Sequence, residues 1–130
     1  MVDVLKKEVT CSFDDAVKKV ENACVSEGFG HLLTKNIDSV FKDRLGVDYS
    51  RYTFILACAP ELAMMALNVS KDVGTIFPCS FVVYEDQGKV MVAHTSIMKI
   101  ASEVGLASKE GMKPVIEETG KRVRKVWDKI

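Results

Sequence analysis

Two of the four cysteines, Cys58 and Cys79, stand at positions where a thiol could do chemistry. Cys58 ends the apolar run at residues 52–58, and Pro60 follows at a position typical of the first residue of a helix. A thiolate there would face the backbone N–H groups and the positive end of that helix, which lower a thiol pKa and favour nucleophilic or metal-binding chemistry. Glu61 falls in the first helical turn, where an acidic residue suits the helix dipole.

Cys79 follows Pro78 and begins a second β-prone stretch, residues 81–84. If that stretch pairs with residues 52–58 in antiparallel register, the end of one strand meets the start of the other. The two sulfurs would then be neighbours in one pocket. His94 comes just after a later strand and could reach the same pocket.

Three interpretations of this cysteine pair are open. Free cysteine is among the most buried residue types, so the pair could simply pack as small apolar side chains. It could form the polarisable wall of an anion or small-ligand site, or it could carry redox or metal chemistry. A metal site would need further ligands, and no two cysteines have the C-x-x-C spacing of zinc or thioredoxin-like sites. The residues do not identify a cofactor.

Composition narrows the class of protein. The chain has 130 residues, 48% hydrophobic and 28% charged, which is ordinary for a globular protein, and we expect a single domain over residues 1–130. Its 18 basic and 18 acidic residues cancel, which argues against nucleic-acid binding. The sequence shows no signal-peptide pattern and no apolar run of about 18 residues that could span a membrane. We therefore expect a cytoplasmic protein whose cysteines are free thiols.

The elements that would position these residues follow from the apolar periodicity, in the order β-α-β-α-β-α-β-β-α. The first six are expected at residues 2–9, 12–28, 29–35, 37–45, 52–58 and 60–69. Strands at 81–84 and 90–93 are joined by a short glycine-containing connection, which is typical of a hairpin. Residues 96–104 look helical, and a final helix is predicted to begin near Pro114. Trp127 is expected to anchor that last helix on the sheet.

Helices scattered between strands, together with a clear hairpin, favour an α+β fold. We expect a two-layer sandwich in which helices cover one face of a mixed or antiparallel sheet. The main alternative is a small doubly wound parallel sheet, and the hairpin at residues 81–93 argues against it.

Several stretches resemble one uncharacterised family. They are Leu-Ala-Cys-Ala-Pro-Glu-Leu-Ala at 56–63, Gly-Thr-Ile-Phe-Pro-Cys at 74–79 and Phe-Val-Val-Tyr-Glu-Asp at 81–86, preceded by Ser-Phe-Asp at 12–14 and Leu-Gly-Val-Asp at 45–48. The family is domain of unknown function 302, and the resemblance covers most of residues 9–95. It implies a two-layer α+β fold like that of the TATA-binding-protein group, and a homodimer, but no activity. Ala59 stands where the family often has asparagine, and Ser80 stands where it often has an amide or basic side chain.

The sequence thus predicts a homodimeric module that binds a small molecule or an anion beside its cysteine pair. The alternative is a thiol-based redox or metal-binding enzyme or sensor that uses the same two cysteines, and nucleic-acid binding is a third hypothesis. The candidate binding residues are Cys58, Pro60, Glu61, Pro78, Cys79 and His94.

Overall fold

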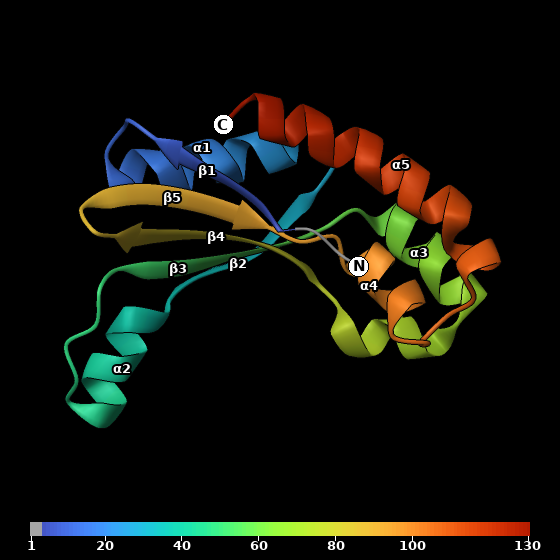
Figure 1. Cartoon of the computed structure of the whole chain (residues 1–130), viewed down its shortest axis with the longest axis horizontal. Coiled ribbons are helices and arrows are strands. Elements are labelled where there is room, and N and C mark those ends of the chain that lie inside the picture. The colour runs from blue at the N-terminus through green and yellow to red at the C-terminus, as the bar shows by residue number, and fades with distance from the viewer. Residues whose placement is uncertain (1–3) are drawn as a thin grey trace.

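The computed structural model of the protein describes residues 4–130, which form a five-stranded sheet and a set of helices (Figure 1). From α1 to α3, each predicted element lies within two residues of its expected bounds. The first predicted strand was expected from residue 2, and residues 2 and 3 lie outside the described residues. In chain order the elements are β1 (Leu5–Val9), α1 (Phe13–Ser26), β2 (Gly30–Asn36), α2 (Ile37–Leu45), β3 (Tyr52–Cys58), α3 (Pro60–Val69), the 3₁₀ helix η1 (Lys71–Ile76), β4 (Cys79–Asp86), β5 (Lys89–His94), α4 (Ile97–Glu103) and α5 (Lys109–Asp128).

The sheet has the strand order β1-β5-β4-β3-β2, and every neighbouring pair is antiparallel. β4 and β5 form the predicted hairpin, which turns at Gln87 and Gly88. These two residues have positive φ angles of 51° and 79°, as a tight type I′ turn requires. Ala57 on β3 lies opposite Cys79 on β4, so the end of one strand meets the start of the next.

The helices form the second layer. α1 and α5 lie over one face of the sheet, whereas α3, η1 and α4 gather at one end and α2 projects from the other (Figure 1). The predicted α+β two-layer sandwich is therefore confirmed, with a sheet that is antiparallel throughout. The doubly wound parallel alternative is wrong, because every pair of neighbouring strands in the sheet is antiparallel.

Fully buried and half-buried side chains alternate along β3 and β4, so one face of the sheet is deeply buried. Ile55, Phe81 and Val92 point from the sheet toward Val20 of α1 and Val126 of α5, and all five are fully buried. Each such side chain contributes about 1.5–3 kcal/mol when removed from water. This burial holds α1 and α5 at a fixed position over β3, β4 and β5.

A second apolar cluster lies among the helices at the end of the sheet. Ala66 of α3 and Val73 of η1 pack there with Met98 of α4 and with Met112 and Val115 of α5. All five are buried. The cluster fixes the second half of α3, η1, α4 and the first turns of α5 relative to one another, and the candidate site lies beside these segments.

The end of the chain differs from the prediction in two ways. The helix expected at residues 96–104 is confirmed as α4 (Ile97–Glu103), although the predicted element order did not count it, and η1 is an additional short helix. The predicted start of the last helix near Pro114 is wrong, because α5 begins at Lys109, where the Ser108 hydroxyl accepts a hydrogen bond of 3.0 Å from the Gly111 N–H. Pro114 sits inside the helix and cannot donate an N–H to the carbonyl of Glu110, which is an exposed residue.

Trp127 is half-buried, so the expected anchor role of this side chain is shared with the fully buried Val126. Lys7 of β1 covers the indole, with its Nζ 4.8 Å from the ring centroid and 2.6 Å from the Trp127 carbonyl oxygen. The lysine stem therefore joins the first strand to the last helix. Among the helices between residues 4 and 130, none has the length and apolar character needed to cross a lipid bilayer.

Candidate functional site

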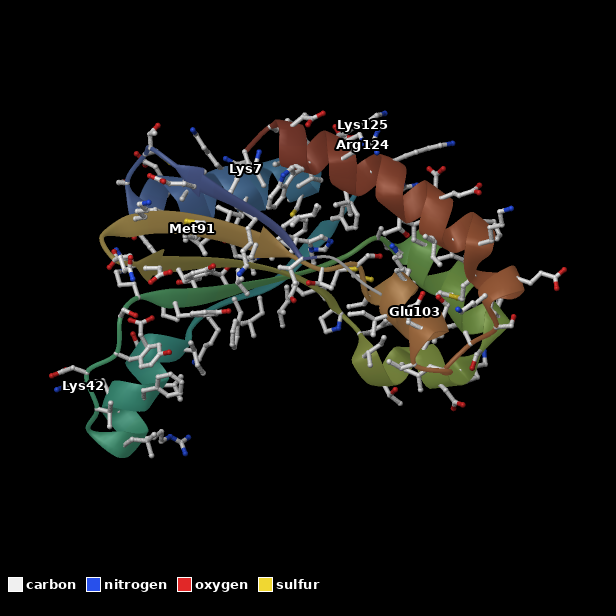
Figure 2. The ribbon with its side chains drawn as sticks, in the orientation of Figure 1. Lys7, Lys42, Met91, Glu103, Arg124 and Lys125 are labelled. Atoms are coloured by element: carbon white, nitrogen blue, oxygen red, sulfur yellow. The ribbon has the colours of Figure 1, made fainter. Side chains whose placement is uncertain are left out.

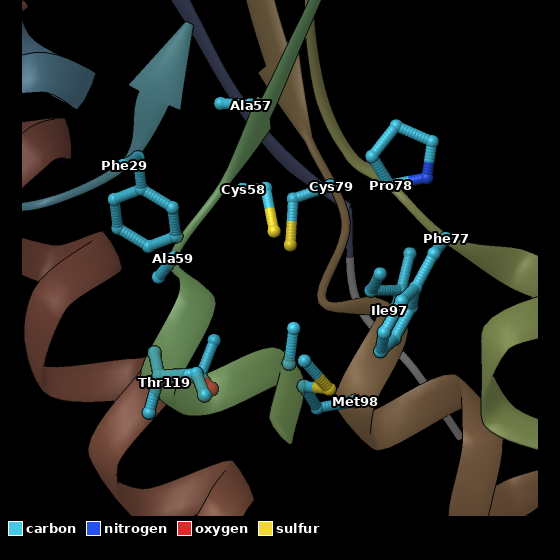
Figure 3. A pocket seen from close by; sticks show the side chains of 12 residues that line it. Phe29, Ala57, Cys58, Ala59, Phe77, Pro78, Cys79, Ile97, Met98 and Thr119 are labelled. Atoms are coloured by element: carbon cyan, nitrogen blue, oxygen red, sulfur yellow. The ribbon is translucent and has the colours of Figure 1, made fainter. Parts of the chain in front are cut away.

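The structure brings Cys58 and Cys79 together. Cys58 lies one residue beyond Ala57, which is the direct β3 partner of Cys79. Adjacent residues on a regular strand point to opposite faces, but both sulfurs here point toward one another and into the same space (Figure 3). Cys58 is the last residue of β3 and Cys79 is the first residue of β4, so the regular alternation of side chains ends at both residues.

The two sulfurs line a small cavity, which we call the thiol cavity. Its volume is about 20 Å³, which is room for one water-sized group. Its walls are largely apolar and include Phe29, Leu62 and Met98. The residues that line it are Phe29, Ala57, Cys58, Ala59, Leu62, Ala63, Phe77, Pro78, Cys79, Ile97, Met98 and Thr119.

Of the six candidate residues, Cys58, Pro78 and Cys79 line the thiol cavity. Pro60 begins α3, as predicted, and Glu61 lies in its first turn, but neither side chain lines the cavity. His94 lines a different cavity, described below. The reason is that β5 lies on the far side of β4 from β3, which separates its last residue from the end of β3.

The carboxylate of Glu61 occupies the N-terminal end of α3. The Glu61 carboxylate accepts a hydrogen bond from its own backbone N–H and lies 3.5 Å from the Arg122 Nη1. The backbone hydrogen bond and the Arg122 charge lower the pKa of this exposed carboxyl. Ala59, the N-cap residue, offers no side-chain acceptor, so the carboxylate of Glu61 takes the place of the missing cap.

Cys58 and Cys79 line the thiol cavity, and the Cys24 thiol lies close enough to Cys79 for the two to influence one another. Burial raises the pKa of Cys79 to about 11, and the nearby Cys58 adds to the effect. Burial also raises the pKa of Cys24 on α1 to about 12, with a further contribution from Cys79. Cys24 is 1% exposed and belongs to the core, as its spacing on the helix predicts. Cys58 is only half-buried, which makes it the more accessible thiol of the pair.

Thr119 is a site residue that sequence reasoning did not single out. It lies on α5 across the thiol cavity from the two sulfurs (Figure 3). Its side chain is 2% exposed, yet its hydroxyl has no hydrogen-bond partner. A helical threonine usually bonds to the carbonyl four residues earlier, so a free buried hydroxyl is unusual. In the sequence, Thr119 could have been recognised as the one hydroxyl-bearing residue within the apolar stripe of Val115, Val123 and Trp127.

His94 ends β5 and is held by two contacts. Its Nδ1 lies 2.8 Å from the Ser80 carbonyl oxygen, and its ring stacks on Phe81 with 4.1 Å between centroids. The other ring nitrogen, Nε2, is buried without a hydrogen-bond partner. Burial lowers the pKa of His94, so the ring is neutral near pH 7.

His94 and Thr119 both line a second and larger space, which we call the His94 cavity. Its volume is about 410 Å³, and it lies where the ends of β1 and β5 meet α4 and α5. Thr119 therefore separates the two cavities and borders both. Between residues 4 and 130, no three His, Cys, Asp or Glu side chains are grouped so that they could hold a metal ion.

Comparison with known proteins agrees with this architecture. An uncharacterized conserved protein from Bacillus stearothermophilus, described as DUF302, has a crystal structure that superimposes with a TM-score of 0.85. It is 20% identical, and the alignment covers 97% of this chain and 96% of that one. No curated protein matches the chain. The family model "Domain of unknown function DUF302" matches residues 5–130, which is the whole fold from β1 to the end of α5. The chain therefore belongs to the family of domain of unknown function 302.

Proposed function

We propose that the protein is a thiol redox module in which Cys58 and Cys79 interconvert between a dithiol and a disulfide. The observation that supports this is the convergence of the two sulfurs on one small cavity (Figure 3). Residues offset by one position on paired strands have Cα atoms roughly 6 Å apart, from the strand spacing and the rise per residue. A disulfide needs about 4.4–6.8 Å, so the pair can close with little backbone movement.

The size of the thiol cavity favours this proposal over a small-molecule ligand at the same place. Sites for small organic ligands usually have volumes of about 300–1,000 Å³. The thiol cavity offers about 20 Å³ between apolar walls. The start of α3 is also less available to an external anion, because the Glu61 carboxylate already bonds there.

The reaction needs an oxidant, for which we propose a small hydroperoxide. The Cys58 thiolate attacks the outer peroxide oxygen, the O–O bond breaks, and the protonated leaving group departs as an alcohol or water, leaving a sulfenic acid on Cys58. The Cys79 sulfur then attacks the Cys58 sulfur, a disulfide forms, and the hydroxyl leaves as water. Cellular thiols would reverse the change, as expected in the reducing cytoplasm that we propose for this protein.

Oxidation of the native protein should therefore link Cys58 to Cys79 before any other pair. We expect hydrogen peroxide at pH 8 to give this disulfide as the main product, identified by mass spectrometry of non-reduced peptides. The rate of the second step, in which Cys79 attacks the sulfenic acid on Cys58, should rise about tenfold per pH unit below pH 11. The reason is that little Cys79 is in the thiolate form below its pKa of about 11. Cys58→Ser should abolish the product, whereas Cys11→Ser should leave it unchanged.

Two results would contradict the redox proposal. One is a product dominated by Cys24 linked to Cys79, since these two thiols also lie close enough to influence one another. The other is a Cys58–Cys79 yield in the native protein no higher than in protein unfolded in urea, which would show that the fold does not direct the pairing.

We also propose that the protein is a homodimer that pairs through the sheet face opposite α1 and α5. That face carries half-buried apolar residues on the central strands, among them Phe54, Leu56 and Val82. Charged residues of both signs, Lys6 and Glu8, lie on the edge strand β1. An apolar centre with a charged rim is typical of an interface, and a formal net charge of zero means that two copies do not repel.

Light scattering during gel filtration at micromolar concentration should give the mass of two chains. Val82→Asp puts a carboxylate at the centre of the proposed interface and should shift the protein to the mass of one chain. Val104→Asp is the matched control, because Val104 is 64% exposed and lies after α4, away from this face. A wild-type protein with the mass of one chain would rule the dimer out.

A further inference from the structure

Two residues that line the His94 cavity each hold a buried polar atom without a partner. Within residues 4–130, the Nε2 of His94 and the Oγ1 of Thr119 are the buried side-chain nitrogen and oxygen atoms that make no hydrogen bond. Their residues are 4% and 2% exposed. Both line the same cavity of about 410 Å³, which is within the usual size range for a small organic ligand. Burying polar groups without partners is unfavourable, so the arrangement is that of a site prepared for a polar ligand.

The hydrogen bond on the other side of the imidazole decides what Nε2 can bind. The Ser80 carbonyl oxygen can only accept, so the His94 Nδ1 must carry the proton that is shared across 2.8 Å. In the neutral ring Nε2 then has a free lone pair. Stacking on Phe81 fixes the plane of the ring and with it the direction of that lone pair. The group that meets Nε2 must therefore be a donor, such as a hydroxyl or an amide N–H.

The open side of the His94 cavity is positively charged. Lys99 of α4 is half-buried and Arg124 of α5 is exposed, and both line the cavity. Neither forms an ion pair with any carboxylate of the described residues. Figure 2 shows Arg124 on the C-terminal half of α5, the part of the helix that runs past Lys7 of β1. Two cations at the rim that make no ion pair with a carboxylate between residues 4 and 130 favour an anionic group on the ligand.

Most of the remaining wall is apolar. Leu5, Ile116, Val123 and Trp127 line the cavity together with Gly120 and Ser96, and the Ser96 hydroxyl already accepts a hydrogen bond from the Lys99 backbone N–H. A ligand that fills it must therefore have an apolar body between a donor at one end and an anion at the other.

We infer that the His94 cavity binds a small organic carboxylate that carries a hydroxyl group at the far end of an apolar body. The hydroxyl donates to the Nε2 of His94 and accepts from the hydroxyl of Thr119. The carboxylate lies between Lys99 and Arg124. This binding site is separate from the thiol pair, and it stands whether or not the cysteines undergo oxidation.

Titration calorimetry with 4-hydroxybenzoate tests the inference, because this probe has a hydroxyl and a carboxylate on opposite ends of an apolar ring. The reduced full-length protein should bind it with saturation. 4-Methoxybenzoate, which has no donor, and phenol, which has no carboxylate, should each bind at least about tenfold more weakly. Equal affinity for the three compounds, or no saturable binding of 4-hydroxybenzoate up to millimolar concentration, would overturn the proposal.

Variants locate the bound probe. Thr119→Val keeps the shape of the side chain and should weaken binding of 4-hydroxybenzoate about fivefold or more. Lys99→Gln and Arg124→Gln lie at the rim, where they do not threaten folding, and each should weaken 4-hydroxybenzoate but not phenol. Cys58→Ser should leave binding unchanged, since Cys58 lines only the thiol cavity. Loss of binding in Cys58→Ser, or full binding in both rim variants, would show that the probe sits elsewhere and would refute the site.

Discussion

Replacing Phe81 with alanine should lower the free energy of unfolding by about 3–5 kcal/mol, which is the usual cost of removing a fully buried aromatic side chain. Phe81 has no exposed surface, and its strand lies at the centre of the sheet order. The ring contacts the cluster under α1 and α5 on one side and stacks on His94 at 4.1 Å. Alanine would remove the transfer energy of the ring and leave a cavity that the paired strands cannot collapse.

Urea denaturation, followed by circular dichroism at one protein concentration, measures the effect. Phe41→Ala is the matched control, because Phe41 lies half-buried on the projecting α2 and meets Tyr49 edge to face at 5.2 Å. It should cost about 1 kcal/mol. Equal losses for the two variants would mean that the core does not depend on Phe81. Phe81→Ala should also weaken binding of 4-hydroxybenzoate, since the imidazole of His94 loses the ring that fixes its plane.

Raising the pH from 7.5 to 10 should destabilise the protein by about 3 kcal/mol through its two buried thiols. The pKa of Cys24 rises from 9.0 to about 12 on folding, and that of Cys79 from 9.0 to about 11. Below pH 9 both states hold these protons, and stability does not change. Above pH 9 the unfolded thiols ionise while the folded ones stay protonated. Stability is therefore lost as the pH rises from 9 toward the folded pKa values, by about 1.4 kcal/mol per unit for each thiol.

Cys24→Ala isolates this effect from the other groups that titrate at high pH. We expect the difference in unfolding free energy between wild type and variant to shrink by about 1 kcal/mol or more between pH 7.5 and pH 10. Urea midpoints at both pH values provide the measurement, with a reductant present. A difference that stays constant across this range would show that burial does not hold the Cys24 proton in the folded state.

Local patterns were sufficient to predict most of the fold. Strand β3 and helix α3 have the predicted bounds, because a short β-branched and aromatic run ends directly before a proline at a helix start. The serine cap of α1 is also observed, with the Asp15 N–H 3.1 Å from the Ser12 hydroxyl. The start of α5 was misplaced, because the proline signal outweighed the weaker Ser108 cap and tertiary packing extended the helix through Pro114.

The candidate site could be predicted only in part. Proximity of Cys58 and Cys79 follows from antiparallel pairing of two neighbouring strands, which the sequence indicates. The position of His94 depends instead on which side of β4 the next strand joins the sheet. The role of Thr119 depends on how α5 crosses the end of the sheet, and helix periodicity alone makes it one more member of a buried stripe. Both facts are set by packing between elements far apart in the chain.

The pairing of β1 with β5 has a consequence for how the chain matures during synthesis. Leu5 pairs with His94, so β1 leaves the ribosome before the other four strands of the sheet and cannot pair until β5 has been made. The other strand pairs join elements closer in sequence, and they can form as the nascent chain lengthens. Throughout this delay β1 remains an unpartnered strand, and its Lys6, Lys7 and Glu8 discourage pairing with other nascent chains. Pairing of β1 with β5 then adds the last strand to the sheet. Lys7 of β1 afterwards donates hydrogen bonds to the carbonyl oxygens of Trp127 and Ile130, which are synthesised after all five strands.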